Sequence, residues 1–124
     1  MVTWTQDQLG KVAGSDELRI SSVRGDGTLG SQRTIWVIRH GDDLYVRSVN
    51  GPSAAWYRGA QSRHQGHIEA GSVSQDVTFA DPGPGLDDQL DAEYRAKYHR
   101  YPANIVNSIL TPQARSTTVK LVPR

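Results

Sequence analysis

Short apolar strands separated by tight turns recur along this chain. Apolar side chains in alternation or in short runs predict six strands, at residues 17–24, 33–40, 43–49, 67–70, 75–79 and 118–122. Turn sequences such as His40-Gly41-Asp42-Asp43 join some of these strands as hairpins. Short hairpin-linked strands do not suit a parallel nucleotide-binding sheet, in which strands alternate with helices. An antiparallel sheet is therefore expected.

Helices are predicted around this sheet. Thr5 and Gln8 have the spacing of a capping box, which predicts a helix over 6–13. Ser53 is a candidate N-cap for a helix over 54–63. Apolar residues at intervals of four and three predict one stripe of a third helix, namely Leu86, Leu90, Tyr94, Tyr98 and Tyr101.

The number of strands favours a closed sheet. Six antiparallel strands must curl into a small barrel or leave edges that can pair with other chains. The apolar run Ile35-Trp36-Val37-Ile38 indicates a strand buried on both faces. Further helical segments are expected at 104–110 and after Thr111-Pro112. We therefore predict an α+β fold, a six-stranded antiparallel barrel with peripheral helices, forming a single domain over 1–124.

Composition excludes several classes of protein. The chain has no cysteine, so it has no disulfide, thiolate metal site or cysteine nucleophile. Polar residues follow Met1, which does not fit a signal peptide, and the longest apolar run is too short to span a membrane. A soluble, cytoplasmic protein with no membrane partner is expected.

The charges are unevenly distributed. Residues 19–67 contain seven arginines and three acids, residues 68–94 contain seven acids and no base, and residues 95–124 contain six bases and no acid. The net charge of +1 does not fit a nucleic-acid-binding protein. Two interpretations are open: the basic segments line a site for a phosphorylated or carboxylated ligand, or the charged faces are solvated or paired.

Other candidate chemistries find little support in the sequence. His64 and His67 have no third ligand nearby, so no metal site is expected. Asp87 and Asp88 are read as acids favoured at a helix N-terminus rather than as catalytic carboxylates. A serine-nucleophile motif and a phosphate-binding lysine loop are both absent, so a hydrolase or a kinase is not expected.

A candidate ligand site lies between residues 21 and 58. A glycine-rich polar turn has Arg24 and Arg33 near its ends, and Asn50-Gly51 leads into a helix that carries Trp56-Tyr57. Backbone N–H groups at a helix start bind anions, arginines bind phosphate through two parallel hydrogen bonds, and aromatic side chains offer a face to a flat ring. The alternative is structural, with glycines for turns, arginines for solvent and the aromatic pair for the core.

Four segments in this region resemble the core of the split-barrel deazaflavin-dependent nitroreductase and quinone-reductase superfamily. The segments are Arg24-Gly25-Asp26-Gly27, Arg33-Thr34-Ile35-Trp36-Val37, residues 42–51 and Trp56-Tyr57. Nearly the whole chain also resembles a family of short bacterial proteins known only as a domain of unknown function. That resemblance rests on Thr3-Trp4-Thr5, residues 45–57 and Tyr94-Arg95-Ala96-Lys97-Tyr98. Together they imply a split barrel and a homodimer.

The superfamily resemblance implies an oxidoreductase that binds FMN or a deazaflavin, and it implies roles for eight residues. Phosphate or tail contacts are expected from Arg24, Ser31 and Arg33. Cofactor contacts are expected from Ser48, Asn50 and Gly51, and Trp56 and Tyr57 are expected under or beside the ring. The protein would hold the ring and the cofactor would carry the hydride.

Two other functions stay open. Trp36 stands where the superfamily has a proline and could fill the cofactor's space, which favours a cofactor-free small-molecule-binding protein, cyclase or isomerase. In that case Trp36, Tyr94 and Tyr98 are the candidate substrate-pocket residues, although tyrosines in a stripe are also common in protein cores. An interaction domain without a small ligand is the remaining alternative. The proposed pocket requires the basic glycine turn to lie beside the start of the Trp56-Tyr57 helix.

Overall fold

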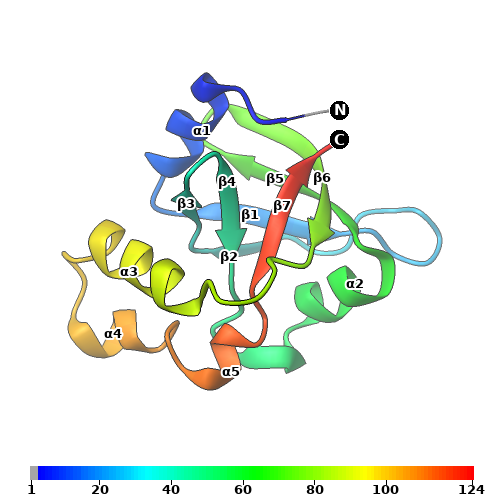
Figure 1. The fold of residues 1–124 in the computed structure, drawn as a ribbon. Coiled ribbons are helices and arrows are strands. Elements are labelled where there is room, and N and C mark those ends of the chain that lie inside the picture. Colours follow the sequence, from blue (N-terminus) through cyan, green and yellow to red (C-terminus); the bar gives the residue numbers. More distant parts are fainter. Residues whose placement is uncertain (1–2) are drawn as a thin grey trace.

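The computed structural model describes residues 3–124, which form a curved antiparallel sheet with helices around it (Figure 1). The strands are β1 (Leu18–Ser22), β2 (Arg33–Ile35), β3 (Ile38–His40), β4 (Asp43–Val46), β5 (Gln65–Ala70), β6 (Val73–Ala80) and β7 (Val119–Pro123). The helices are α1 (Gln6–Ala13), α2 (Ala55–Arg63), α3 (Asp87–Lys97), α4 (Ala103–Asn107) and α5 (Pro112–Arg115), with a 3₁₀ turn η1 (Gly51–Ser53) before α2. Among these helices, none has the length and apolar character needed to cross a membrane.

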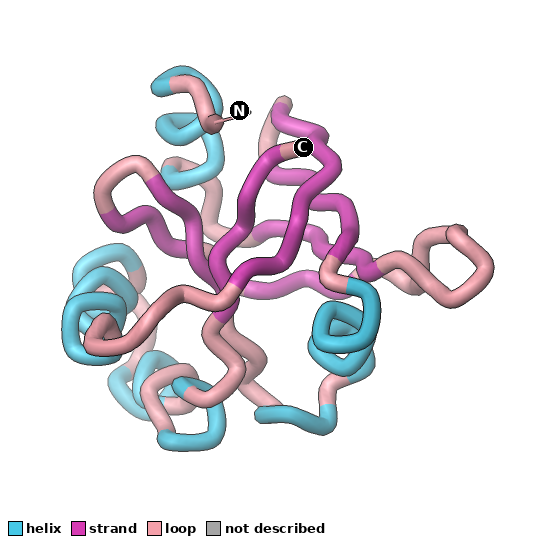
Figure 2. The backbone as a smooth tube through the Cα atoms, turned by 45° about the vertical axis from the view of Figure 1, so that its right-hand side comes forward, coloured by secondary structure: helices cyan, strands magenta, loops and turns pink. Residues whose placement is uncertain are grey.

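The order of strands in the sheet is β2-β1-β5-β6-β7-β4-β3, and every neighbouring pair is antiparallel. The two edge strands, β2 and β3, are consecutive in sequence and are separated only by Trp36 and Val37. Since consecutive Cα atoms are about 3.8 Å apart, the two edges approach within roughly 11 Å of each other at this corner. The sheet must therefore curl into a half-barrel, as the tube in Figure 2 shows.

The predicted α+β class and antiparallel sheet are confirmed, but the predicted count of six strands is wrong. The segment 33–40 was expected to be one strand, and it breaks into β2 and β3. At the break, the Tyr98 hydroxyl lies 3.1 Å from both the backbone N and the backbone O of Val37. A side chain thus takes the place of a strand partner at Val37, and the chain turns from one edge of the sheet to the other.

Local signals at the helix ends explain where the helices begin. The capping box of α1 is present: Thr5 Oγ1 accepts from Gln8 N at 3.1 Å, and Gln8 Oε1 accepts from Thr5 N at 3.0 Å. Ser53 does not cap α2, because Gly51–Ser53 forms η1 and Ala54 occupies the N-cap position. The Ser53 hydroxyl instead donates to the carbonyl of Asn50.

Apolar side chains gather in two clusters, one on each side of the sheet wall. The first cluster fills the barrel and receives Trp56 and Ala60 from α2. The second lies between the sheet and α3 to α5, and it contains Leu90, Tyr94 and Tyr98 of the predicted helical stripe. This arrangement leaves α2 on one flank of the barrel, beside the end of β1, and α3 to α5 on the other (Figure 1).

Candidate functional site

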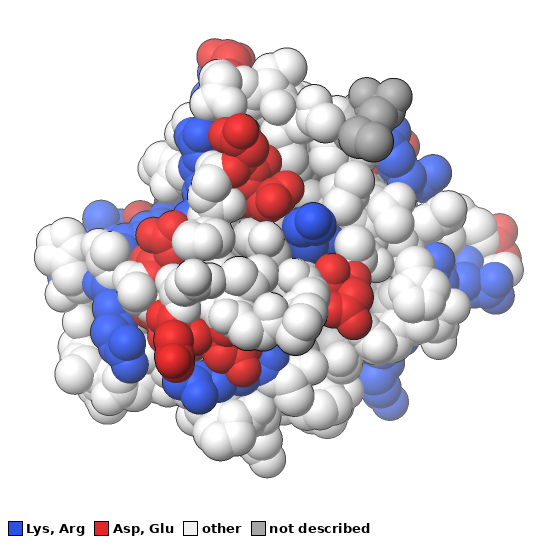
Figure 3. Space-filling view, viewed as in Figure 1, with Lys and Arg blue, Asp and Glu red and all other residues white. Residues whose placement is uncertain are grey.

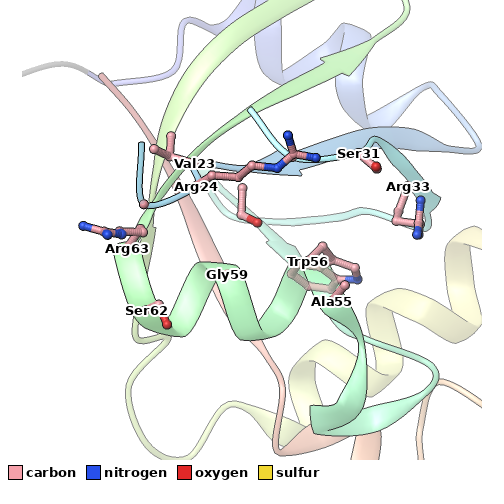
Figure 4. Close-up of a pocket in the computed structure, with 12 residues that line it drawn as sticks. Val23, Arg24, Ser31, Arg33, Ala55, Trp56, Gly59, Ser62 and Arg63 are labelled. Carbon is pink, nitrogen blue, oxygen red and sulfur yellow. The ribbon is translucent and has the colours of Figure 1, made fainter. Parts of the chain in front are cut away.

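A pocket of about 480 Å³ lies between α2 and the segment that joins β1 to β2. Seven residues between Ser22 and Arg33 line one wall, and five residues of α2 line the other. Figure 4 shows Arg24 and Arg33 approaching from the loop side, with Trp56 and Arg63 toward opposite ends of α2. The basic glycine turn and the start of the Trp56-Tyr57 helix therefore do lie together.

Close packing of α2 against β1 forms this pocket, and Gly59 makes the packing feasible. A Cβ atom added at Gly59 would overlap Ser22 Oγ and would lie 2.8 Å from Ser22 Cβ. Such distances are not tolerated between real side chains, so any larger residue at position 59 must push the helix away from the strand. Gly59 therefore sets the width of the pocket.

Three arginines, Arg24, Arg33 and Arg63, line the pocket, and no acidic residue is among its lining residues. Within residues 3–124, none of the three forms an ion pair. Uncompensated positive charge that surrounds a concave surface raises the local concentration of anions. The pocket is therefore suited to a negatively charged ligand.

Five other arginines are paired, whereas Arg58, Arg95 and Arg124 form no ion pair in the described part of the chain. Arg19 pairs with Glu69, Arg39 with Asp42, and Arg100 with Asp16, while Arg47 and Arg115 both pair with Asp91. Figure 3 shows acidic and basic side chains side by side on the face that includes α3. Each interpretation of the charge pattern thus holds for some of the arginines: pairing for these five, and an open basic pocket for the three around α2.

Two glycines bring the loop backbone close to the arginine side chains. A Cβ at Gly25 would lie 2.8 Å from Arg63 Nη2, and a Cβ at Gly30 would lie 3.3 Å from the carbonyl oxygen of Ser22 and 3.8 Å from Arg24 Nε. The absence of a side chain at Gly25 lets the Arg63 guanidinium lie against the loop backbone, so this arginine of α2 and the loop meet in one pocket.

The turn between these glycines is held by its own hydrogen bonds. The backbone N–H of Arg24 donates to the carbonyl of Thr28 at 2.7 Å, and Gly27, with φ +87°, closes the turn by donating to the carbonyl of Arg24. The Asp26 carboxylate accepts from the hydroxyl and the backbone N–H of Thr28, and these two hydrogen bonds lower the pKa of Asp26. None of these bonds uses the Arg24 guanidinium, which stays available to a ligand.

The start of α2 adds backbone donors to the same pocket. Ala54 at the N-cap has no side-chain acceptor, and Ala55 and Trp56 of the first turn line the pocket. The first N–H groups of a helix have no partner within the helix, and they carry the positive end of the helix dipole. This helix start therefore reinforces the positive potential that the three arginines create.

Four of the eight predicted cofactor residues meet in this pocket, namely Arg24, Ser31, Arg33 and Trp56. Arg63 joins them, and the sequence interpretation missed it. Trp56, Gly59 and Arg63 are spaced by three and four residues, which places them on one face of a helix. That spacing was the signal that could have identified Arg63.

The other four predicted residues lie outside the pocket. Ser48 is buried and donates its backbone N–H to Thr117 Oγ1 at 2.8 Å, and Asn50 is exposed in the turn that follows. Gly51, with φ +73°, lies against α5. Tyr57 is one position after Trp56 on α2, so it points about 100° away around the helix and approaches the carbonyl of Ser116 at 3.4 Å.

Tyr94 and Tyr98 lie on the other side of the sheet wall, and Trp36 lies at the corner between the edge strands β2 and β3. Tyr94 and Tyr98 are fully buried, and this burial raises the pKa of both hydroxyls. The Trp36 ring stacks on the Tyr98 ring, with 3.8 Å between centroids and 6° between planes. Trp36 lines a second pocket and is absent from the lining of the arginine pocket. It therefore leaves the space between Arg33 and Trp56 free.

Comparison with solved structures finds the same fold in several other proteins. It is similar to HutZ, the heme storage protein from Vibrio cholerae, at 12% identity and a TM-score of 0.67, covering 96% of this chain and 89% of that chain. It is similar to an F420 reductase at 16% identity and a TM-score of 0.58, covering 93% and 90%. It is also similar to an FAD-binding protein from Mesorhizobium loti at 15% identity and a TM-score of 0.55, covering 99% and 92%. At these identities the likeness establishes the fold alone.

No curated protein matches this sequence. Residues 8–121 match a family described as an uncharacterized protein conserved in bacteria (DUF2255). This match spans almost the whole chain and confirms the expected family of short bacterial proteins. The protein is thus a member of the bacterial DUF2255 family.

Proposed function

We propose that this protein binds a phosphorylated flavin-type cofactor, FMN or a deazaflavin, and acts as an oxidoreductase. The observation that carries the proposal is the arginine pocket, in which Arg24, Arg33 and Arg63 surround about 480 Å³ and no acidic residue is among the lining residues. In this proposal the pocket holds the phosphate of the cofactor.

The residues present suit a phosphate group. Guanidinium groups form paired, charge-assisted hydrogen bonds to phosphate oxygens. Ser31 and Ser62 add hydroxyl donors to the lining, and the start of α2 adds backbone donors. A bound flavin-type cofactor supplies hydride or electron transfer, and the protein supplies binding, orientation and electrostatics.

The similar folds support the same class of ligand. Two of the compared structures are an F420 reductase and an FAD-binding protein. Those names describe the other proteins, and they make a flavin-type ligand the first one to test here. Formation of a homodimer and residence in the cytoplasm remain predictions from the sequence.

Titration of the purified protein with FMN, and in parallel with a phosphorylated deazaflavin, tests the proposal. We expect saturable binding in the micromolar range that weakens as salt is added, because screening reduces the attraction between arginine and phosphate. Replacing Arg24 or Arg33 by Gln should weaken binding about tenfold or more.

Arg58→Gln is the matched control, because Arg58 is an exposed arginine of the same helix that does not line the pocket. It should bind as the wild type does. Absence of binding for both cofactors at high micromolar concentration would refute the proposal. Binding of inorganic pyrophosphate without either cofactor would favour the cofactor-free alternative.

A further inference from the structure

A second pocket, of about 260 Å³, lies beside the arginine pocket and differs from it in character. Five of its lining residues are apolar, namely Ile35, Trp36, Val49, Ile105 and Ile109. Val49 and Ile105 are 50% and 44% exposed, and they are two of the three large apolar residues that the described surface exposes most. Concave surfaces lined by apolar and aromatic side chains are typical of small-molecule sites.

Trp36 is held in place before any ligand arrives. Its ring stacks on Tyr98, and the Tyr98 hydroxyl donates to the carbonyl of Asp16 at 2.6 Å and contacts the backbone of Val37. Lys97 Nζ also donates to the Val37 carbonyl at 2.6 Å. A wall fixed in this way loses little conformational freedom on binding, which favours affinity.

The lining of the two pockets meets at β2 (Arg33–Ile35) and the residue that follows it. Arg33 lines the arginine pocket, and the next three residues, Thr34 to Trp36, line the apolar pocket. A strand advances about 3.3 Å per residue, so Arg33 and Trp36 are separated by about 10 Å along the chain. A ligand with a short flexible chain between a phosphate and a ring could reach both.

The charges of the apolar pocket do not favour an anion. Its charged lining residues are Glu17 and Arg47, and the Arg47 guanidinium is paired with Asp91 at 2.6 Å. Trp56, at the end of the arginine pocket, is only 5% exposed, so it offers little surface to a ring. The positively charged surface and the apolar aromatic surface thus lie at successive positions along residues 33–36.

We propose that the apolar pocket against Trp36 is the ring subsite for a ligand whose phosphate binds among the arginines. This inference rests on the proposed function and assigns the ring to Trp36 instead of Trp56. The ligand class is a planar, uncharged ring system joined to a phosphate by a short flexible chain.

The test compares FMN, riboflavin and inorganic pyrophosphate in binding titrations. FMN should bind more tightly than pyrophosphate, and flavin fluorescence should be quenched when the ring stacks on an indole. Trp36→Leu should weaken FMN binding by about 5- to 100-fold, relieve the quenching, and leave pyrophosphate binding unchanged. Arg33→Gln should weaken FMN and pyrophosphate binding but leave riboflavin binding unchanged.

Substitutions at the rim protect the test against misfolding of the Trp36 variant. Val49→Ser and Ile105→Ser remove apolar surface from exposed positions, so the fold should tolerate them, and each should weaken riboflavin and FMN binding several-fold. Leu29→Ser is the matched control, since Leu29 is 46% exposed and lines neither pocket. It should leave riboflavin affinity unchanged.

The outcomes separate this inference from the proposed function. The ring subsite is refuted if FMN binds no more tightly than pyrophosphate. It is also refuted if FMN affinity does not change in Trp36→Leu or in either rim variant. Neither result contradicts phosphate binding in the arginine pocket. Loss of FMN quenching in Trp56→Phe but not in Trp36→Leu would place the ring at Trp56 and overturns the ring subsite at Trp36 as well. If neither FMN nor pyrophosphate binds, the proposed function is refuted, and the ring subsite is refuted with it.

Discussion

Arg47 Nη1 donates to Asp91 Oδ1 at 2.6 Å, and both residues are only 1% exposed. The two residues come from the end of β4 and from α3, so this buried ion pair fixes the helix against the sheet. Arg115 from α5 also pairs with Asp91, and Arg47 Nε donates to Thr118 Oγ1 at 2.9 Å. One carboxylate thus joins three segments that are far apart in sequence.

Removing the Asp91 carboxylate should destabilise the protein strongly. Asp91→Ala leaves the buried Arg47 guanidinium with only the exposed Asp87 carboxylate, 3.8 Å from its Nη2. Loss of one partner of a buried pair costs about 3–5 kcal/mol. Chemical denaturation measures this as a lower free energy of unfolding. Asp42→Ala is the control, because Asp42 pairs with Arg39 at the surface, and it should cost less than about 1 kcal/mol. Equal losses for the two variants would contradict a structural role for the buried pair.

The same carboxylate should make stability depend on pH in acid. Burial raises the pKa of Asp91, but hydrogen bonds and charge from Arg115 and Arg47 outweigh burial and lower it below the ordinary 3.8. Because the folded-state pKa is lowered, the stabilisation is fully present above pH 3.8 and is lost as the pH falls through the folded-state value. Unfolding free energies of the wild type and Asp91→Asn should therefore converge below pH 3.8. A constant difference across that range would argue against the coupling.

Gly59→Ala should destabilise the protein and widen the arginine pocket, because its Cβ would collide with Ser22. Overpacking of this kind costs about 1–3 kcal/mol. Gly10→Ala is a control within another helix, where a Cβ would meet nothing within 4 Å. It should stabilise the protein by about 0.5–1 kcal/mol, since alanine favours helix over glycine. Thermal melting of both variants tests whether the two stability changes have opposite signs.

Arg63→Gln should weaken binding of phosphorylated ligands about as much as Arg24→Gln does. Arg63 lies at the far end of α2, and it lines the same pocket without an acidic partner in the described residues. Loss of one charge-assisted contact corresponds to about tenfold in affinity. Calorimetric titration of both variants with pyrophosphate measures this loss of affinity. An Arg63 variant with wild-type affinity would remove this residue from the site.

Tyr98→Phe should loosen the corner between β2 and β3. The Tyr98 hydroxyl accepts from the backbone N–H of Val37 and donates to the carbonyl of Asp16, so its loss leaves a buried donor unsatisfied. Such a loss costs about 1–3 kcal/mol. Urea denaturation gives the stability change, and hydrogen exchange at Val37 should become faster. Unchanged exchange at Val37 would mean that the hydroxyl does not hold this corner.

Sequence alone determined the features that depend on neighbours along the chain. The α1 capping box joins Thr5 and Gln8, the β5–β6 hairpin follows alternating side chains around Gly71, and Thr111 caps α5 through Ala114 N. Each of these interactions spans at most a few residues, so local spacing is sufficient to predict it. The antiparallel class follows from the same short connections.

Tertiary contacts decided what lies at the candidate site. The break at Val37 depends on Tyr98, 61 residues away, and the buried Arg47 depends on Asp91, 44 residues away. Which arginines are paired and which remain open depends on where the acids of other segments lie, and no local pattern carries that information. The packing of Gly59 on Ser22 selects the side of α2 that meets β1, so Arg63 lines the pocket and Tyr57 does not. Ser48, Asn50 and Gly51 precede α2 and lie outside the pocket.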